Sequence, residues 1–150
     1  NIGALNITGR LEDFLWLSSL TNLRSLGMSG MNNVVGDLSA LTFLTALRAL
    51  QSLTISEVSW TGELPVLLGT LTSLTYLDLG GLQTSQFPRW AMDLTALQYL
   101  DAFHASNLRT GVVPQDLSRL NQLQHFDATG NGLVGTLPEY WTSLEHLTFL

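Results

Sequence analysis

In three segments of the chain, an aromatic side chain stands two residues before an aspartate. The pairs are Tyr76 and Asp78, Tyr99 and Asp101, and His125 and Asp127. If these segments are extended and adjacent, each pair faces one side of a sheet, with neighbouring carboxylates roughly 5 Å apart. Such carboxylates repel one another and raise one another's pKa unless a cation lies over them. Two interpretations have equal weight: a site for a basic peptide, a cationic sugar or a metal ion, and three solvated carboxylates without a ligand.

Signals for catalysis are poor. His104, His125 and His146 lack the spacing of metal ligands, and no nucleophile motif accompanies His125. The sequence also has no glycine-rich loop that could cradle a phosphate. We therefore predict a non-enzymatic protein with no catalytic residues, no cofactor and no dedicated metal site.

The composition predicts a folded protein that does not bind nucleic acid. Of 150 residues, 45% are hydrophobic and 12% charged, which favours a large core over disorder. The formal charge is −6, and all six basic residues are arginine, so no basic patch is available for a phosphate backbone. Cysteine is absent. No apolar run approaches the roughly 18 residues of a membrane span, so we predict none in this segment.

An apolar pair of the form LxL recurs along the chain, and each copy predicts a short strand. We take the first residue of each pair as its anchor. The anchors are Leu5, Leu26, Leu53, Leu77, Leu100, Phe126 and Leu150. Successive anchors lie 21, 27, 24, 23, 26 and 24 residues apart. This period is close to the 20 to 29 residues or so of one class of solenoid repeat, in which neighbouring copies bury each other's apolar side.

Turn residues keep the same register as the anchors. All four prolines, Pro65, Pro88, Pro114 and Pro138, share one place in their copies, and three of them follow Gly62, Gly111 and Gly135 by three residues. Glycine there predicts a positive φ or a close approach, and proline fixes the bend that follows. Asn32, Asn107 and Asn131 stand four residues before a glycine. We expect these amides to pair backbone groups that point inward at the turn.

The full unit is clearest from Leu120 to Leu144, as LxxLxxFxAxxNxLxGxLPxxWxxL. It resembles the plant-type leucine-rich repeat, LxxLxxLxLxxNxLxGxIPxxLxx, of plant receptor ectodomains, polygalacturonase-inhibiting proteins and some protozoan surface antigens. The resemblance covers essentially the whole chain and implies an α/β-type solenoid. This is a right-handed superhelix with a concave parallel β-sheet and convex 3₁₀ or irregular segments. We expect residues 1–150 to form a single domain of about six to seven repeats, part of a longer array.

The same resemblance implies a receptor-like protein at the cell surface or outside the cell. One N-glycosylation sequon, Asn6-Ile7-Thr8, supports a glycoprotein weakly, because about one match is expected by chance. In this register Trp60 and Trp141 occupy leucine positions, so we expect both to lie in the core.

Residues on either side of each anchor should face outward on the concave sheet. Those before the anchors read Ala4, Ser25, Ser52, Tyr76, Tyr99, His125 and Phe149, and those after read Asn6, Gly27, Thr54, Asp78, Asp101 and Asp127. Four successive rings suit an interaction surface, although stacked rings also stabilise a sheet without a ligand. Two glutamines lie on the other side of the rings, and Phe103 lies beyond the aspartates. With these, the predicted ligand-binding residues are Tyr76, Asp78, Gln98, Tyr99, Asp101, Phe103, Gln124, His125, Asp127 and Phe149.

Three functions fit these patterns. The leading hypothesis is a recognition module whose concave face binds a protein or peptide. The carboxylates favour a basic partner. A glycan is a second candidate ligand. A structural or adhesive spacer in a surface assembly needs only the shape of the solenoid. Inhibition of a secreted polysaccharide-degrading enzyme is suggested by the resemblance alone.

Overall fold

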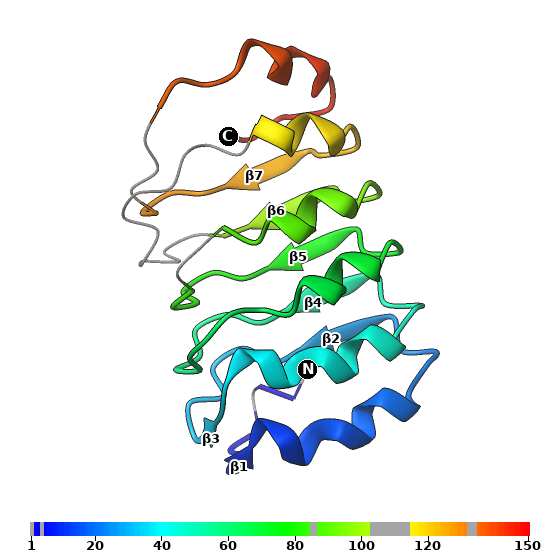
Figure 1. Cartoon of the computed structure of the whole chain (residues 1–150), viewed down its shortest axis with the longest axis vertical. Helices are drawn as coiled ribbons and strands as arrows, with labels where there is room; N and C mark the ends of the chain where they lie inside the picture. The colour runs from blue at the N-terminus through cyan, green and yellow to red at the C-terminus, as the bar shows by residue number, and fades with distance from the viewer. Residues whose placement is uncertain (1, 4, 85–86, 103–114, 132–134) are drawn as a thin grey trace.

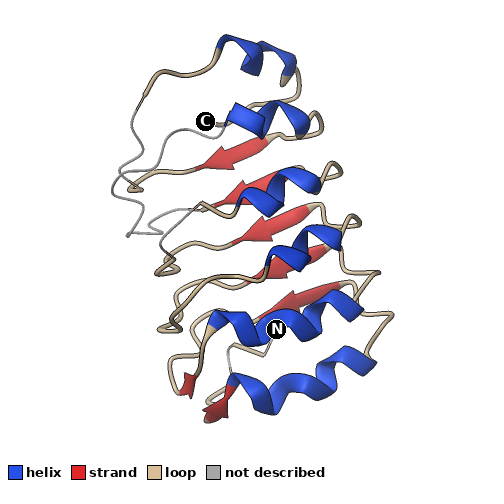
Figure 2. Ribbon diagram, in the orientation of Figure 1, coloured by secondary structure: helices blue, strands red, loops and turns tan. Residues whose placement is uncertain are grey.

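The chain folds as a right-handed solenoid in which each turn carries a strand on one side and a 3₁₀ helix on the other (Figures 1 and 2). The computed structural model describes residues 2–3, 5–84, 87–102, 115–131 and 135–150. Strands stack along one side of the molecule and the helices along the opposite side, with successive turns running from one end to the other. This arrangement confirms the α/β-type solenoid expected from the repeats.

In the part of the chain that the structure describes, five short strands form the main parallel sheet. They are β2 (Ser25–Gly27), β4 (Ser52–Thr54), β5 (Tyr76–Asp78), β6 (Tyr99–Asp101) and β7 (His125–Asp127), in the order β2-β4-β5-β6-β7. Their register pairs the predicted anchors with one another: Leu26, Leu53, Leu77, Leu100 and Phe126. A further bridge joins His125 to Phe149. The periodic pattern therefore places five strands and their register correctly.

Within the described residues, six 3₁₀ helices lie on the opposite side of the solenoid. They are η1 (Leu11–Ser19), η2 (Leu38–Ala46), η3 (Val66–Thr70), η4 (Arg89–Asp93), η5 (Gln115–Arg119) and η6 (Glu139–Ser143). Pro65, Pro88 and Pro138 each stand immediately before a helix, where the ring fixes φ and no backbone donor is lost. Gly62 and Gly135 adopt φ values of 85° and 118°, which confirms the positive φ predicted there.

A second, smaller parallel ladder was not predicted. It pairs β1 (Gly9–Arg10) with β3 (Val34–Val35), and an isolated bridge between Asp37 and Thr61 continues it. β1 and Asp37 lie directly before helices η1 and η2, and Val34–Val35 and Thr61 lie directly before Gly36 and Gly62. Two-residue strands are too short to show an alternating pattern, so hydrophobic periodicity could not reveal them.

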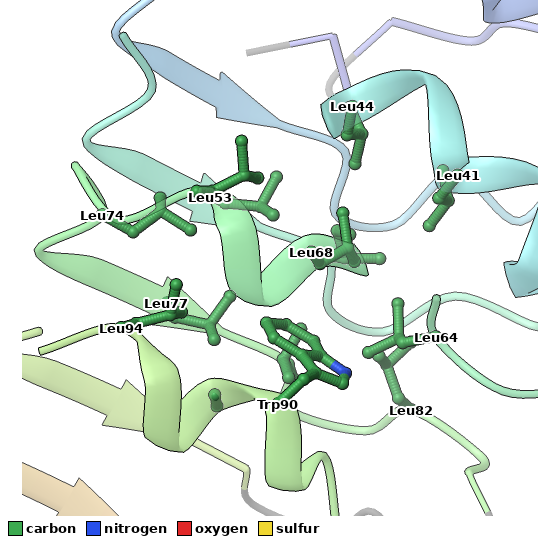
Figure 3. Close-up of a cluster of buried hydrophobic side chains, with 14 of the residues drawn as sticks. Leu41, Leu44, Leu53, Leu64, Leu68, Leu74, Leu77, Leu82, Trp90 and Leu94 are labelled. Carbon is green, nitrogen blue, oxygen red and sulfur yellow. The ribbon is translucent and has the colours of Figure 1, made fainter. Parts of the chain in front are cut away.

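Leucines from both sides of the solenoid meet in one continuous core. Figure 3 shows Leu53 and Leu77 from the strands meeting Leu68 from η3 near the ring of Trp90. All four side chains are buried. Trp60 and Trp141 are also buried, as predicted, and the indole N–H of Trp60 donates to the Val34 carbonyl oxygen at 2.9 Å.

The register predicted for the first copy is wrong. The Ile2 amide donates to the Gly27 carbonyl (2.9 Å) as the Met28 amide donates to the Thr54 carbonyl (2.9 Å), so Ile2 occupies the place of Met28. Leu5 therefore follows the strand position and is 57% exposed, and Asn6 lies in the turn instead of on the sheet. The gap of 21 residues before Leu26 was the shortest in the series, because it measured from the wrong leucine.

At the other end, Leu150 holds the last anchor position but is 61% exposed, since no further copy covers it in the part of the chain that the structure describes. Its neighbour Phe149 keeps the predicted register through its bridge to His125.

The predicted inward role of the turn asparagines is confirmed at one described turn, that of Asn131. Asn131 is buried, and its Nδ2 donates to the carbonyl oxygens of Ala102 (2.6 Å) and Ala128 (3.0 Å). Asn32 is exposed, so its predicted inward role is wrong. The inward place in that turn belongs to the buried Met31. Asn107 lies outside the described residues.

Candidate functional site

The aromatic side chains predicted on one column form a continuous ladder, which we call the aromatic column: Tyr76, Tyr99, His125 and Phe149. Ring centroids are 4.3 Å apart for the first pair and 4.2 Å for the next two, with interplanar angles of 8° to 9°. Parallel strands lie about 4.8 Å apart, so one ring per strand stacks with little adjustment. The rings thus cover one another's faces and present mainly their edges to solvent.

A second column of outward side chains, the acidic column, comprises Asp78, Asp101 and Asp127. The strand register places the three opposite one another on β5, β6 and β7, as predicted. Asp78 accepts a hydrogen bond from the Gly80 amide (2.9 Å), and Asp127 accepts one from the Thr129 amide (2.8 Å). Backbone donors therefore hold two of the carboxylates at the end of their strands.

The environment of Asp78 disfavours its charged form. Burial raises the pKa of this half-buried carboxyl, and the nearby charge of Asp101 adds to the rise, although the Gly80 amide opposes it. The expected repulsion within the acidic column is therefore present at Asp78, with desolvation as its larger cause. A cation over this position would relieve both effects.

Both tyrosines of the aromatic column resist ionisation. Burial raises the pKa of Tyr99 to about 12, and the neighbouring Tyr76 and Asp101 contribute further. Burial is also the first cause of the raised pKa of Tyr76, followed by the charge of Asp78. Near neutral pH both phenols are protonated, and a hydrogen bond joins their two hydroxyls.

A neutral column flanks the rings on the side away from the aspartates. It contains Gln51, Thr75, Gln98, Gln124 and Thr148. The Thr75 and Thr148 hydroxyls donate to the carbonyl oxygens of Gln51 (3.1 Å) and Gln124 (3.0 Å). The predicted contact residues Gln98 and Gln124 are both exposed. We call the three columns together the sheet face.

Towards β2 and β4, the sheet face carries much smaller side chains. The aromatic column continues there as Ser52 and Ser25, and the acidic column as Thr54 and Gly27. The sheet face therefore has a tall half on β5 to β7 and a low half on β2 and β4. The change falls between β4 and β5, where Ser52 pairs with Tyr76.

Nine of the ten predicted contact residues lie together on this face. The tenth, Phe103, falls outside the described residues, as does His104. Among the described residues, no group of three or more His, Cys, Asp or Glu side chains is placed to hold a metal ion. Within the same residues, no helix has the length and apolar character needed to cross a membrane.

Sequence reasoning missed a hollow of about 270 Å³ between the segments that precede η3 and η4. It is lined by Glu63, Leu64, Val66, Thr84, Phe87, Pro88, Arg89 and Trp90. Leu64, at a leucine position of the repeat, is buried, and so is Trp90, which the pattern left open between core and rim. A gap between two well-packed copies leaves no signal in such a pattern.

Comparison with known proteins gives structural matches only. No family model and no curated protein sequence matches the chain. Among solved structures, the receptor kinase HAESA of Arabidopsis, in complex with the peptide hormone IDA and a co-receptor, is 28% identical, with a TM-score of 0.73. A TDR receptor is 26% identical, with a TM-score of 0.78. The match covers 96% of this chain and 28% of the HAESA chain, and 95% and 24% for the TDR receptor.

A third match is the LRR ectodomain of the plant membrane receptor kinase GASSHO1/SCHENGEN3 from Arabidopsis thaliana, solved in complex with CASPARIAN STRIP INTEGRITY FACTOR 2. It is 26% identical, with a TM-score of 0.67 over 95% of this chain and 19% of that chain. The chain thus spans about a quarter or less of the length of two of these structures and 28% of the third.

Proposed function

We propose that this chain, a leucine-rich repeat protein of the plant type, is a non-enzymatic recognition module that binds a protein or peptide through its sheet face. The observation that carries this proposal is the register of β5, β6 and β7. It sets aromatic, acidic and amide columns side by side on one outward surface. Edges of rings supply contact area, while carboxylates and amides supply directed hydrogen bonds, a combination that suits a polypeptide partner.

The structural relatives support a polypeptide ligand. HAESA was solved with a peptide hormone, and the GASSHO1/SCHENGEN3 ectodomain with CASPARIAN STRIP INTEGRITY FACTOR 2. We do not assign either ligand to this chain. What carries over is that a solenoid of this shape can present an extended strand surface to a partner.

The relatives also support a place outside the cell or at its surface, because they include the ectodomain of a membrane receptor kinase. A glycan on Asn6 fits this setting. Asn6 is exposed in the turn after the first strand position, although its Oδ1 accepts a hydrogen bond from Asn33 Nδ2 at 2.6 Å. Glycosylation at this turn would leave the tall half of the sheet face uncovered.

A structural spacer is the second candidate, and the aromatic column favours it. Rings that stack at 4.2 to 4.3 Å already contribute to stability without any ligand. In this case the sheet face would be a reinforcement of the solenoid, and its loss would change stability but no binding.

The test compares binding by the parent chain and by a double variant, Tyr99→Ala with Asp101→Ala. A displayed library of random linear peptides is selected on the parent, and the recovered peptides are measured against both proteins. We expect at least about a tenfold loss of affinity, or about 1.4 kcal/mol, with an unchanged far-ultraviolet circular dichroism spectrum. Leu67→Ala, on the exposed helix side of the solenoid, should leave binding unchanged. Peptides that bind parent and double variant equally would leave the spacer role standing instead.

A further inference from the structure

The aromatic column has an outer ring face at each end, at Tyr76 towards β4 and at Phe149, and only the face of Tyr76 has an aspartate of the acidic column on the same strand. Both faces of the Tyr99 and His125 rings are covered by their neighbours in the stack. Tyr76 stacks on Tyr99 with one face only, and its other face is turned along the column towards Ser52 on β4. Serine has no ring to continue the ladder. A partner can therefore reach an aromatic face at this position, whereas at Tyr99 and His125 it meets ring edges.

The side chains next to this open face are small, and most of them are polar. Ser52 and Ser25 form the floor along the column, and Thr54 and Gly27 continue it beside them. The change from the tall Tyr76 side chain to the small Ser52 side chain forms a step on the sheet face. This step accommodates one flat group that lies parallel to the Tyr76 ring, with hydroxyls below it. A bulky aliphatic side chain would bury these hydroxyls without offering them hydrogen-bond partners.

The charge beside the step is negative. Asp78 lies two residues after Tyr76 on the same face of β5, so their Cα atoms are about 6 to 7 Å apart. Asp101 lies beside Asp78 on the next strand. Burial and the charge of Asp101 raise the pKa of Asp78, so a positive group there would be favourable. The chain as a whole has a formal charge of −6.

Among the described residues, no arginine forms a salt bridge with Asp78. Arg10 pairs with Glu12, and Arg119 pairs with Asp93. The Arg48 guanidinium donates to the Thr70 carbonyl oxygen. On the described part of the sheet face, the basic side chain is Arg24. It precedes β2, two strands from β5, and lies on the side of the aromatic column away from the aspartates.

A flat group that is also positive is a guanidinium. It stacks on aromatic faces and pairs with carboxylates, whereas the lysine ammonium is a compact point charge that cannot stack. We propose that the polypeptide partner presents an arginine, whose guanidinium stacks on the open face of Tyr76 above Ser52 and pairs with the Asp78 carboxylate. This inference rests on the proposed function and names the chemistry of the partner at one position.

The test uses the ¹⁵N-labelled chain and three capped glycine-rich peptides that differ only at a central arginine, lysine or citrulline. Citrulline keeps the flat shape and loses the charge. We expect the arginine peptide to shift the amide signals of Ser52, Tyr76 and Asp78 and to bind at least about fivefold more tightly than the lysine and citrulline peptides. Equal binding of the arginine and lysine peptides would overturn the proposal, as would shifts confined to other parts of the chain.

Two matched substitutions separate the open face from general charge attraction. Ser52→Tyr extends the ladder by one ring and covers Tyr76, so it should abolish the preference for arginine, whereas Leu67→Tyr, which adds a ring on the exposed helix side, should leave it intact. Asp78→Asn should weaken arginine binding and reduce its dependence on salt. An unchanged preference in both Ser52→Tyr and Asp78→Asn contradicts the proposal, even if one of these variants folds poorly.

The library peptides of the previous section distinguish failure of this inference from failure of the proposed function. If those peptides require Tyr99 and Asp101 but contain no essential arginine and tolerate Ser52→Tyr, the sheet face binds polypeptides and the inference is wrong. If no selected peptide depends on the sheet face, both are wrong.

Discussion

The imidazole of His125 lies face to face with the ring of Tyr99, with centroids 4.2 Å apart and planes inclined by 8°. The two residues are 26 positions apart in the chain and meet because β6 and β7 pair in parallel register. Tyr99 stacks on Tyr76 through its other face, at 4.3 Å. A single side chain therefore joins three copies of the repeat on the surface, which makes Tyr99 the most informative residue to change.

Removing the Tyr99 ring should destabilise the solenoid. Tyr99→Ala deletes two stacking contacts, each worth about 0.5–1.5 kcal/mol, so the free energy of unfolding should fall by about 1–3 kcal/mol. Ser25→Ala, in the same column on β2, should change it by less than about 0.5 kcal/mol. Urea denaturation followed by circular dichroism measures both. Equal values for the two variants would show that the ladder adds nothing to stability.

The raised pKa of Tyr99 predicts that the folded chain loses stability in alkali. This pKa is raised to about 12 in the folded chain, against about 10 in an unfolded one. Because the folded value is the higher, the stabilisation is complete below about pH 10 and is lost as the pH rises towards 12. Urea denaturation between about pH 9 and pH 11.5 should show a smaller fall for Tyr99→Phe than for the parent. Parallel curves for the two proteins would refute this assignment.

Asp78 should reduce stability as the pH rises above its unfolded pKa of about 3.9. Its folded pKa is raised, so the favourable contribution is complete below that value and is lost as the pH rises through the folded pKa. Asp78→Asn removes the titration. The variant should therefore gain stability relative to the parent between about pH 3 and pH 6, as measured by urea denaturation at each pH.

Asp37→Asn is the matched control for Asp78→Asn. Hydrogen bonds from the Ser39 hydroxyl and amide lower the pKa of Asp37, so its contribution is present above the unfolded pKa and is lost in acid. This exposed variant should lose stability relative to the parent over the same pH range. A common direction for both substitutions would contradict the assigned causes.

The indole of Trp60 should matter far more than that of Trp16. Trp60→Phe leaves the Val34 carbonyl without its buried donor and a void beside the smaller ring, which should cost about 2–4 kcal/mol. Trp16 is 58% exposed, so Trp16→Phe should change the free energy of unfolding by less than about 0.5 kcal/mol. Guanidinium denaturation compares them. A small effect at Trp60 would mean that water or a shifted backbone replaces its donor.

Asn131 should be needed for its two hydrogen bonds. Asn131→Leu keeps a similar volume but removes the donor to Ala102 and Ala128, which should cost about 2–4 kcal/mol. Asn32→Leu changes an exposed side chain and should cost less than about 0.5 kcal/mol. Thermal unfolding of the two variants gives the comparison. Similar midpoints would contradict the role assigned to the buried amide.

Strand positions could be predicted from the sequence where the pattern extended over several copies. Leucines such as Leu53 and Leu77 repeat with a constant flank of turn residues, so the outward residues of β4 to β7 followed from simple alternation. The same reasoning failed at Leu5, because a leucine in a turn can imitate an anchor when no earlier copy is present to check it. At Asn32 the error was one residue, because the position was counted back from Gly36, and the chain from Leu26 to Gly36 is one residue longer than that from Phe126 to Gly135.

The candidate site was predictable in membership but not in detail. Strand register alone brings Tyr76, Tyr99 and His125 into one column. The orientation of the rings depends on side-chain torsions, which no motif specifies, so face-to-face stacking and edgewise contact were equally open. The open face of Tyr76 follows only once stacking is known, since it is defined by which ring faces are already covered.

The aromatic column also bears on how the molecule opens. In a solenoid each copy contacts only its neighbours, so cooperativity depends on the strength of each junction. Rings tie β5 to β6 and β6 to β7 across the surface, in addition to the leucines beneath them, whereas the junction between β4 and β5 has no such tie. The β2–β4 junction lacks one as well, so we expect local opening on the β2 and β4 side of β5, and we expect the amides of β5 to β7 to exchange slowly and as one block.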